Sequence, residues 1–273
     1  MTKKGFYYAG VAVGILLLAG CQQGETDESD TAERASNTAS STSITVSKSS
    51  SSSALVSETT TTQTNRTEEV PQVTTFAAGT LLEAVAQNDL QTTNEILNSP
   101  GYPIDETNIE GNTPLNLAVH ANAVEIAKAL IDHGADINAQ NNISDSPYLY
   151  AGAEGRTEIL AYMLEKGEPD QQKVNRFGGN ALIPAAEKGH IDNVRLLLDD
   201  GRAAINFQNN YGYTALIEVV ALKDGSQIYQ QITQLLLERG ADPAIRDNTG
   251  RTAMDYAVAN GFSQLQAILA AYQ

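Results

Sequence analysis

The sequence is poor in cysteine, in tryptophan and in positive charge. Its 273 residues include one cysteine and no tryptophan, and 17 Lys and Arg stand against 33 Asp and Glu. A single cysteine excludes a disulfide scaffold and a metal site built from several thiolates. The net charge of −16 disfavours binding to nucleic acid and to anionic lipid, since both need a cationic surface. With only 5 Phe, we expect a modest core built from Ala, Leu, Ile and Val.

The one cysteine, Cys21, follows a short apolar stretch near the N-terminus. Lys3 and Lys4 precede the 13 apolar or small residues 6–18. This stretch is too short for a membrane-spanning helix, which needs about 20 residues, and is typical of a signal peptide. The sequence LAGC at residues 18–21 resembles the lipobox of bacterial lipoproteins. The resemblance implies cleavage before Cys21 and transfer of a diacylglyceryl group to its sulfur.

Residues 1–20 are therefore predicted to be a lipoprotein signal peptide, with Cys21 as the lipidation site. Two acyl chains anchor a protein firmly, because each buried CH₂ contributes about 0.8 kcal/mol. Two alternatives remain at this point. One is an ordinary secreted protein whose cysteine ends the signal peptide by chance, and the other is a plain transmembrane anchor.

Residues 21–75 form a stretch rich in hydroxyl side chains. Positions 22–75 contain 12 Ser and 13 Thr among 54 residues, with few apolar side chains between them. Such a composition cannot offset the entropy of ordering, so this segment is predicted to be a disordered tether. As a random coil it would span roughly 40 Å. A solvated spacer and a glycosylated or wall-interacting stalk are both consistent with it.

Residues 76–273 carry a net charge of −13 and contain an internal repeat. An apolar residue recurs at intervals of 33 or 34, with one interval of 38, and a small or β-branched residue follows it three positions later. The landmarks are Leu81, Leu115, Tyr148, Leu182, Leu216 and Met254. A second landmark, two apolar residues followed by x-x-Gly, ends at Gly134, Gly167, Gly201 and Gly240. A five-residue insertion at about residues 221–226 accounts for the long interval.

Each unit reads as helix, tight turn, helix and extended loop. Asn88, Asn122, Gly155 and Gly189 fall at the turns between helices, which need a left-handed residue. Pro184 falls within the first turn of its helix, where backbone N–H groups have no partner, so we expect that helix to continue through it. Stacked units of this kind predict an all-α solenoid of about six helix-turn-helix units.

The repeat resembles the ankyrin repeat. The best matches are GNTPLNLAVH…ALIDHGADINAQ at residues 111–140 and LLLERGADPAIRDNTGRTA at residues 235–253. Thr113 and Pro114 supply the helix cap and the first helical residue of that motif. The signature histidine of the family is replaced by Asn116, Leu149, Ile183, Ile217 and Asp255. This departure puts local rigidity in doubt rather than the fold.

The resemblance implies that the protein binds partners through its concave face. In the family the variable positions flank the turn glycine of each loop and lie at the end of each first helix. Here these positions are Ile109, Glu110, Asn112, His120, Asn142, Ile143, Asp145, Glu154, Arg176, Phe177, Glu187, Lys188, Asn210, Tyr211, Tyr213, Leu222, Asn248, Thr249 and Arg251. We single out Phe177, Tyr211 and Tyr213, because aromatic residues are enriched among binding hot spots. Alternatively, these rings cover neighbouring loops.

The sequence offers no pattern typical of catalysis or of cofactor binding. His120, His133 and His190 are the three histidines, and their spacing matches neither a metal site nor a catalytic triad. No Gly-rich phosphate loop occurs, and Cys21 would be acylated. We therefore expect a protein that is not an enzyme and that uses no cofactor and no metal.

The predicted function is a non-catalytic protein-binding module, anchored by lipid to the extracytoplasmic face of a bacterial membrane. The acidic domain favours a basic protein partner, no nucleic acid is expected, and the membrane is contacted only through Cys21. A monomer is the expected state. One alternative is a structural or adhesive surface spacer, and another is an immunity or inhibitor protein against an envelope-targeting toxin. A focused acidic patch beside Phe177 and Tyr211 would favour recognition, whereas an evenly charged surface would favour a spacer.

Overall fold

The computed structural model describes residues 75–272, and all of the secondary structure in this part of the chain is helical. The predicted signal peptide, Cys21 and all but the last residue of the predicted tether lie outside the described residues. Twelve helices follow one another within the described part: α1 (Thr80–Ala86), α2 (Leu90–Leu97), α3 (Pro114–Ala121), α4 (Val124–Asp132), α5 (Pro147–Ala153), α6 (Thr157–Lys166), α7 (Leu182–Glu187), α8 (Ile191–Asp200), α9 (Ala215–Ala221), α10 (Gln227–Glu238), α11 (Ala253–Ala259) and α12 (Ser263–Ala270). They form six helix pairs, as the period predicts.

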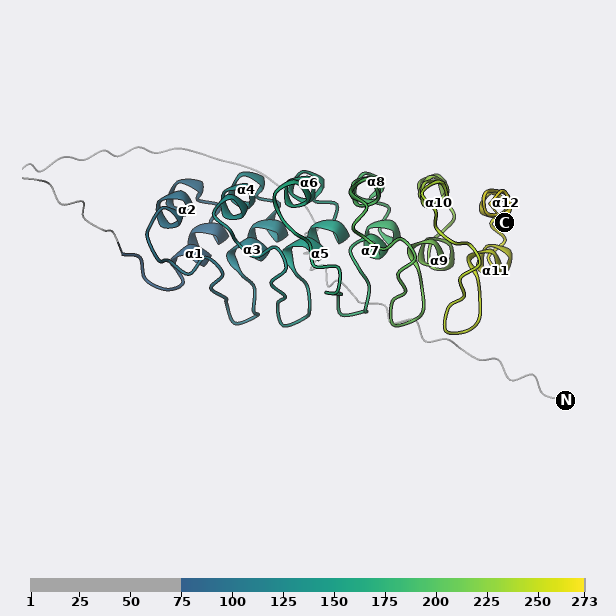
Figure 1. Cartoon of the computed structure of the whole chain (residues 1–273), viewed down its shortest axis with the longest axis horizontal. Helices are drawn as coiled ribbons and strands as arrows, with labels where there is room; N and C mark the ends of the chain where they lie inside the picture. The colour runs from purple at the N-terminus through teal and green to yellow at the C-terminus, as the bar shows by residue number, and fades with distance from the viewer. Residues whose placement is uncertain (1–74, 273) are drawn as a thin grey trace, which may run out of the picture. The chain divides into compact units, whose positions relative to one another are not determined.

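The helix pairs stack side by side into a solenoid (Figure 1). The first helices of the pairs pack against one another in one row, from α1 to α11, and the second helices pack in a parallel row, from α2 to α12. An extended loop leads from each pair to the next and projects on the side of the first helices (Figure 1). The predicted all-α solenoid of six units is confirmed.

The repeat landmarks form the core of the stack. Leu81, Leu115 and Leu182 are fully buried, and Tyr148 and Leu216 are at most 2% exposed. The last landmark, Met254, is only partly buried, and its helix α11 belongs to the terminal pair. Each unit thus buries its apolar face mainly against its neighbours, which is the general property of solenoids.

Side-chain caps fix where four of the six first helices begin. The hydroxyls of Thr113, Ser146, Thr214 and Thr252 each accept a hydrogen bond from the backbone N–H three residues later. This cap satisfies a donor that the helix itself leaves without a partner. Two substitutes for the family's histidine complete the cap.

Those two substitutes are Asn116 and Asp255. The side chain of Asn116 accepts from the backbone N–H of Thr113 at 3.1 Å, and Asp255 accepts from that of Thr252 at 2.8 Å. Asn116 also donates to the backbone oxygen of Asp145 in the next loop, at 3.3 Å. Polar side chains at this position therefore brace two of the units locally.

The turns between paired helices have the expected backbone. Asn88, Asn122, Gly155 and Gly189 all have positive φ, between 55° and 80°. Helix α7 contains Pro184 as its third residue and continues to Glu187, as predicted.

The fifth pair has the longer turn that the insertion predicts. Residues 222–226 separate α9 from α10, and Asp224 accepts a hydrogen bond from the backbone N–H of Ser226 at 3.0 Å. Gly225 within it has a φ of 70°.

Candidate functional site

Five extended loops, here called the fingers, have tips of the same construction. The tips are residues 108–112, 141–145, 175–179, 209–213 and 247–251. In each, a leading Asn or Asp accepts two backbone N–H bonds with one side-chain oxygen, and the fourth residue has positive φ. Asn175, for example, accepts from Phe177 at 2.9 Å and from Gly179 at 3.0 Å. Asn and Asp favour such turns because their short side chains reach their own backbone.

Hydrogen bonds also join each of three fingers to the next. The backbone N–H of Asn142 donates to the oxygen of Glu110, and its side chain donates to the oxygen of Ile109, both at 3.0 Å. Asn210 donates in the same way to Phe177 at 3.0 Å, and Asn248 donates to Tyr211 at 3.2 Å. The rigid row of fingers therefore fixes the side chains that it carries.

Three apolar side chains occupy the same place on successive tips. Ile143, Phe177 and Tyr211 lie 34 residues apart and are 49%, 50% and 58% exposed. Ile109, on the first finger, is 89% exposed. The core does not bury these side chains, so they form an apolar edge that a partner can cover.

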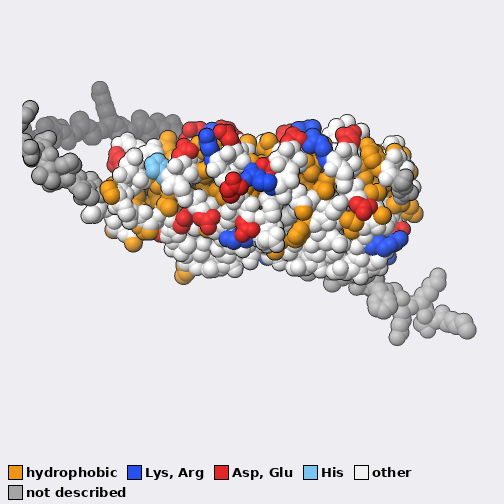
Figure 2. All heavy atoms as spheres, viewed as in Figure 1, with side chains coloured by type: hydrophobic (Ala, Val, Ile, Leu, Met, Phe, Trp, Pro, Cys, Tyr) orange, Lys and Arg blue, Asp and Glu red, His pale blue; other side chains and the backbone are white. Residues whose placement is uncertain are grey.

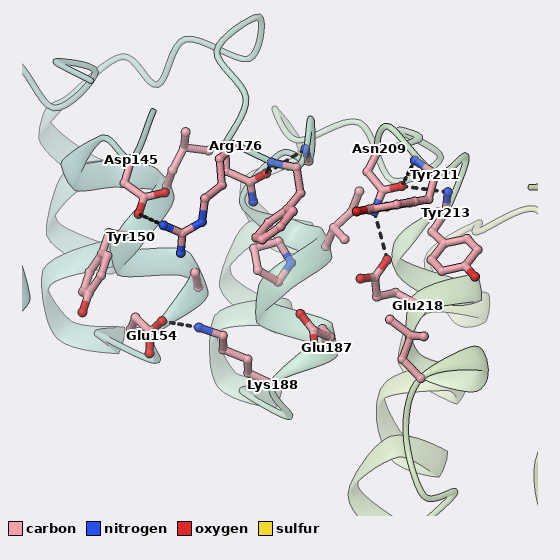
Figure 3. A pocket seen from close by; sticks show the side chains of 18 residues that line it. Asp145, Tyr150, Glu154, Arg176, Glu187, Lys188, Asn209, Tyr211, Tyr213 and Glu218 are labelled. Carbon is pink, nitrogen blue, oxygen red and sulfur yellow. Dashed lines mark hydrogen bonds and ion pairs between the residues drawn. The ribbon is translucent and has the colours of Figure 1, made fainter. Parts of the chain in front are cut away.

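A cavity of about 470 Å³ lies between the fingers and the first helices of the third to fifth pairs (Figure 3). We call it the finger groove. Nine of the residues predicted for partner binding line it: Asp145, Glu154, Arg176, Phe177, Glu187, Lys188, Tyr211, Tyr213 and Leu222. Nine others line it that were not predicted for partner binding: Leu149, Tyr150, Ala153, Asn175, Gly179, Ile183, Pro184, Asn209 and Glu218. Side chains that are distant in sequence thus meet in one hollow.

Ion pairs between neighbouring units involve most of the charged side chains of the finger groove. Lys188 on the fourth unit forms an ion pair with Glu154 on the third. Arg176 lies 3.9 Å from Asp145, and its guanidinium also stacks 5.4 Å from the ring centre of Phe177. Burial raises the pKa of Asp145, and Arg176 opposes that rise.

Lysine and arginine side chains lie next to acidic ones over much of the face drawn in Figure 2. At the border of the finger groove, Lys223 pairs with Glu187 at 2.9 Å. The charges of this face are therefore interspersed rather than gathered into one acidic patch. This distribution favours a structural spacer, so recognition depends on the finger groove itself rather than on the charge of the surface.

Glu218 is the buried carboxylate of the finger groove. It lies on α9 and is 8% exposed, and its Oε2 accepts a hydrogen bond from Asn209 Nδ2 at 3.1 Å (Figure 3). Burial, and then the negative charge of Glu187, raise the pKa of Glu218 to about 7, against the opposing effects of Asn209 and Lys223. No Lys or Arg among residues 75–272 forms an ion pair with it. The signal for this residue was the single charge within the apolar helix ALIEVVA.

Tyr213 differs from Phe177 and Tyr211, with which the sequence analysis grouped it. Its ring is half-buried and packs edge-on against Tyr256 of the next unit, with ring centres 6.0 Å apart. Burial raises the pKa of Tyr213, and the hydrogen bond with Tyr256, whose hydroxyl oxygen lies 3.2 Å away, raises it further. Tyr213 thus lines the finger groove and also joins two units.

The hydroxyl of Tyr256 donates to Asp247 at 2.5 Å. Burial alone would raise the pKa of Asp247, but hydrogen bonds from Tyr256, Arg251 and Thr249 hold it at about 2. Arg251 lies over the ring of Tyr256, 5.4 Å from its centre. The last finger is therefore held by its own side chains and by Tyr256 of α11.

The remaining predicted residues lie outside the finger groove. Asn112 is buried, and its Oδ1 accepts from Asn141 at 2.7 Å, so its side chain is used between two fingers. His120 stacks on Tyr150 with ring centres 4.0 Å apart, and burial lowers its pKa. Ile109, Glu110, Asn142, Ile143, Asn210, Asn248, Thr249 and Arg251 lie on the finger tips.

Comparison with known families matches nearly all of the described chain. A family model described as ankyrin repeats (3 copies) matches residues 81–175 and 168–247, and one described as ankyrin repeats (many copies) matches residues 229–269. The chain belongs to the ankyrin repeat family. Ankyrin repeat domains mediate protein–protein interactions and are generally non-catalytic scaffolds.

Bacterial ankyrin proteins are among its similar relatives. The putative ankyrin repeat protein YahD of Escherichia coli is 36% identical over 190 residues, which cover 70% of this chain and 94% of YahD. The crystal structure of the ankyrin repeat protein EF0377 is 65% identical, with a TM-score of 0.72, and the match covers 73% of this chain and all of the other. An ankyrin repeat domain from Acinetobacter baumannii is 43% identical, with a TM-score of 0.69, over 72% of this chain and 98% of the other.

Within the described ankyrin domain, no helix is long and apolar enough to cross a membrane. Residues 75–272 also contain no cluster of three or more His, Cys, Asp or Glu side chains that could hold a metal ion. The chemistry that the described site offers is recognition by aromatic faces, an apolar floor and one buried carboxylate.

Proposed function

We propose that this chain is a lipid-anchored, extracytoplasmic module that binds another protein in the finger groove. The observation that carries the proposal is the finger groove itself. It combines a rigid row of hydrogen-bonded fingers, exposed apolar side chains at Phe177 and Tyr211, and a cavity of about 470 Å³. An interface of this kind needs an apolar anchor site surrounded by polar groups.

The shape of the finger groove supports a polypeptide ligand. Its floor consists of apolar side chains from α5 and α7, among them Leu149, Ile183 and Pro184. Its rim carries the cross-unit pairs of Lys188 with Glu154 and of Arg176 with Asp145. The proposed ligand is an extended segment that follows the row of fingers.

The sequence around Cys21 supports the anchor, although these residues lie outside the described structure. The LAGC motif and the preceding apolar stretch have the order of a lipoprotein signal. The 54 residues between Cys21 and residue 76, if fully extended, would reach on the order of 180 Å. Tethering raises the effective concentration of the domain near the membrane toward the millimolar range, so that modest affinities suffice.

Site-specific photo-cross-linking in living cells tests the binding proposal. A photoreactive residue at position 143, on the exposed apolar edge and on the same finger as the cavity-lining Asp145, is expected to capture a protein that the double variant Phe177→Ala/Tyr211→Ala no longer captures. Val258→Ala is the matched control, because Val258 is 60% exposed on α11 and does not line the finger groove. If the double variant captures every partner that the control captures, the finger groove is not the binding site. That result would favour the alternative of a structural or adhesive surface spacer.

Substitution of Cys21 tests the anchor separately. Cys21→Ala is expected to abolish incorporation of labelled fatty acid and to change the fractionation of the protein. Persistent membrane association of a correctly processed Cys21→Ala chain would contradict lipid anchoring without affecting the binding proposal.

A further inference from the structure

The finger groove holds one acidic side chain whose charge is not used within the protein. Of its four acidic residues, Asp145, Glu154 and Glu187 each form an ion pair with a Lys or Arg of a neighbouring finger or unit. Glu218 forms no ion pair among the described residues, and its one protein partner is the neutral amide of Asn209. The unused charge therefore lies toward the C-terminal end of the finger groove.

The carboxylate of Glu218 is accessible from the finger groove. One oxygen accepts from Asn209, and the other points away from Asn209 toward the middle of the hollow (Figure 3). A carboxylate at this depth is costly to keep ionised, because burial removes its hydration. A glutamine could accept the same hydrogen bond from Asn209 without a charge, so the charge itself is best explained by a ligand that it receives.

The walls around Glu218 suit a long aliphatic side chain that ends in a cation. Tyr211 and Tyr213 stand above it with ring centres 6.2 Å apart, and Leu222 also lines the hollow. Aromatic faces attract cations, and apolar walls accept the methylene stem of Lys or Arg. A metal ion fits poorly, because one carboxylate supplies too few ligands and no three-ligand cluster exists in residues 75–272.

From this arrangement we propose that the C-terminal part of the finger groove receives a Lys or Arg side chain of the partner polypeptide, with its cationic group paired to Glu218 beneath Tyr211 and Tyr213. This inference rests on the proposed function and specifies the chemistry of the partner. The preference for a basic partner then comes from the buried carboxylate of Glu218 rather than from the net negative charge of the whole domain.

Binding of a cation should also ionise Glu218. With a pKa of about 7, roughly half of the Glu218 side chains carry a proton at pH 7, and a bound cation favours the ionised form. The charged or titratable groups that act on Glu218 are Glu187 on α7, Lys223 in the insertion and Tyr213 on the finger. Binding of a basic peptide at pH 7 is therefore accompanied by release of about half a proton per bound peptide.

Peptide pools that differ at one position test the proposal. The probes are acetylated and amidated hexapeptides with neutral residues at five positions and Lys, Arg, norleucine or Glu at the third. Each pool is titrated into the full chain in detergent and followed by microscale thermophoresis. The Lys and Arg pools are expected to bind at least about tenfold more tightly than the norleucine pool, with the Glu pool weakest. The Glu218→Gln variant should bind Lys and norleucine pools within about twofold of each other.

Glu238→Gln is the matched control, because it removes the same charge from α10 of the same unit, outside the finger groove. It should keep the preference for Lys and Arg. Calorimetry of the unsubstituted chain in buffers of different ionisation enthalpy provides a second readout, in which the Lys pool releases protons and the norleucine pool does not. Because this measurement uses only the unsubstituted chain, it does not depend on whether a variant folds.

Equal binding of the Lys and norleucine pools would overturn the inference and leave an apolar protein-binding groove, so the proposed function would stand. A preference for Lys that survives Glu218→Gln would place the cation elsewhere and would also overturn it. If no pool binds, the inference fails as well, and the in-cell cross-link through position 143 decides the proposed function independently.

Discussion

Asn209 donates its side-chain N–H to Glu218 at 3.1 Å while its oxygen accepts from the backbone N–H groups of Tyr211 and Tyr213, at 2.9 and 3.0 Å. One amide thus shapes the fourth finger and holds the buried carboxylate of α9. Because Asn209 is itself buried, water cannot easily replace these bonds. The side chain of Asn209 therefore links the backbone conformation of the fourth finger to the position of the Glu218 carboxylate in the finger groove.

Asn209→Ala is expected to lower the free energy of unfolding by about 1–3 kcal/mol, because it leaves two backbone N–H groups and a buried carboxylate without their partner. Asn175→Ala is the matched control, since Asn175 caps the third finger in the same way but has no bond to a carboxylate. Urea unfolding of both variants measures the difference. Equal losses would show that the bond to Glu218 contributes nothing measurable.

Glu218 should make stability depend on pH. A glutamate carboxyl ordinarily titrates near 4.5, whereas the folded chain holds the pKa of Glu218 at about 7. Between these values the folded state binds the extra proton, so stability falls as the pH rises from about 4.5 through 7. Below 4.5 both states are protonated and the penalty is absent. Well above 7 this penalty is complete, at roughly 3 kcal/mol.

The Glu218→Gln variant isolates this effect, because glutamine cannot ionise and can still accept from Asn209. The variant should gain stability relative to the unsubstituted chain by roughly 2–3 kcal/mol between pH 4.5 and pH 8. Urea unfolding at four pH values measures the gain, and Glu238→Gln corrects for the loss of one negative charge. A constant difference across this range would contradict the buried, proton-binding state of Glu218.

The sequence predicted the solenoid because each unit repeats the same local physics. Buried landmarks such as Leu115 and Leu182, left-handed turns such as Gly189, and caps such as Thr113 depend on residues a few positions apart. A unit of 33 or 34 residues is too small to bury its own apolar face, so the units must stack against one another. The same reasoning located the longer turn after α9.

The site was only partly predictable, because its chemistry depends on contacts between units. Nothing local to Tyr213 shows that its ring packs against Tyr256, 43 residues later. The role of Asn209 depends on a finger that folds back onto α9. Glu218 carried a sequence signal, as the one charge in an apolar helix, but its lack of a cation partner depends on where Lys223 is placed.

Arg202 provides a test of how neighbouring units are held together. Its guanidinium donates to the backbone oxygens of Leu164 at 2.7 Å and Gly167 at 3.1 Å, at the end of α6 in the preceding unit. Asp200 holds the guanidinium in place at 2.6 Å, and this hydrogen bond lowers the pKa of Asp200. Arg202 thus satisfies carbonyl groups that the helix leaves without partners.

Arg202→Lys should lower the free energy of unfolding by about 1–2 kcal/mol, because an ammonium group cannot reproduce the planar fork. Amide exchange should accelerate in the last turn of α6. Arg239→Lys is the control, since Arg239 forms a single surface pair with Asp199, and such pairs contribute between 0 and about 1 kcal/mol. Similar losses in both variants would argue against a capping role for Arg202.

Gly212 tests the contact between the last two fingers. Its φ is +77°, and a Cβ placed there would lie 2.6 Å from the backbone nitrogen of Asn248. That nitrogen donates to the oxygen of Tyr211 at 3.2 Å, so an added methyl group would push against a backbone that already joins the two fingers. Gly240 has a φ of +93° and open space around its Cα, and therefore shares the backbone strain without the clash.

Both Gly212→Ala and Gly240→Ala should lose about 1–2 kcal/mol from the left-handed backbone. Gly212→Ala should lose more, and the amide of Asn248 should exchange faster only in that variant, because the fingers must separate to admit the methyl group. Urea unfolding and amide exchange measure the two effects. If both variants lose the same free energy of unfolding and the exchange rate of the Asn248 amide is unchanged, the two fingers move apart at no energetic cost. The rigid presentation of Tyr211 would then have no support, since its carbonyl is the acceptor in this contact.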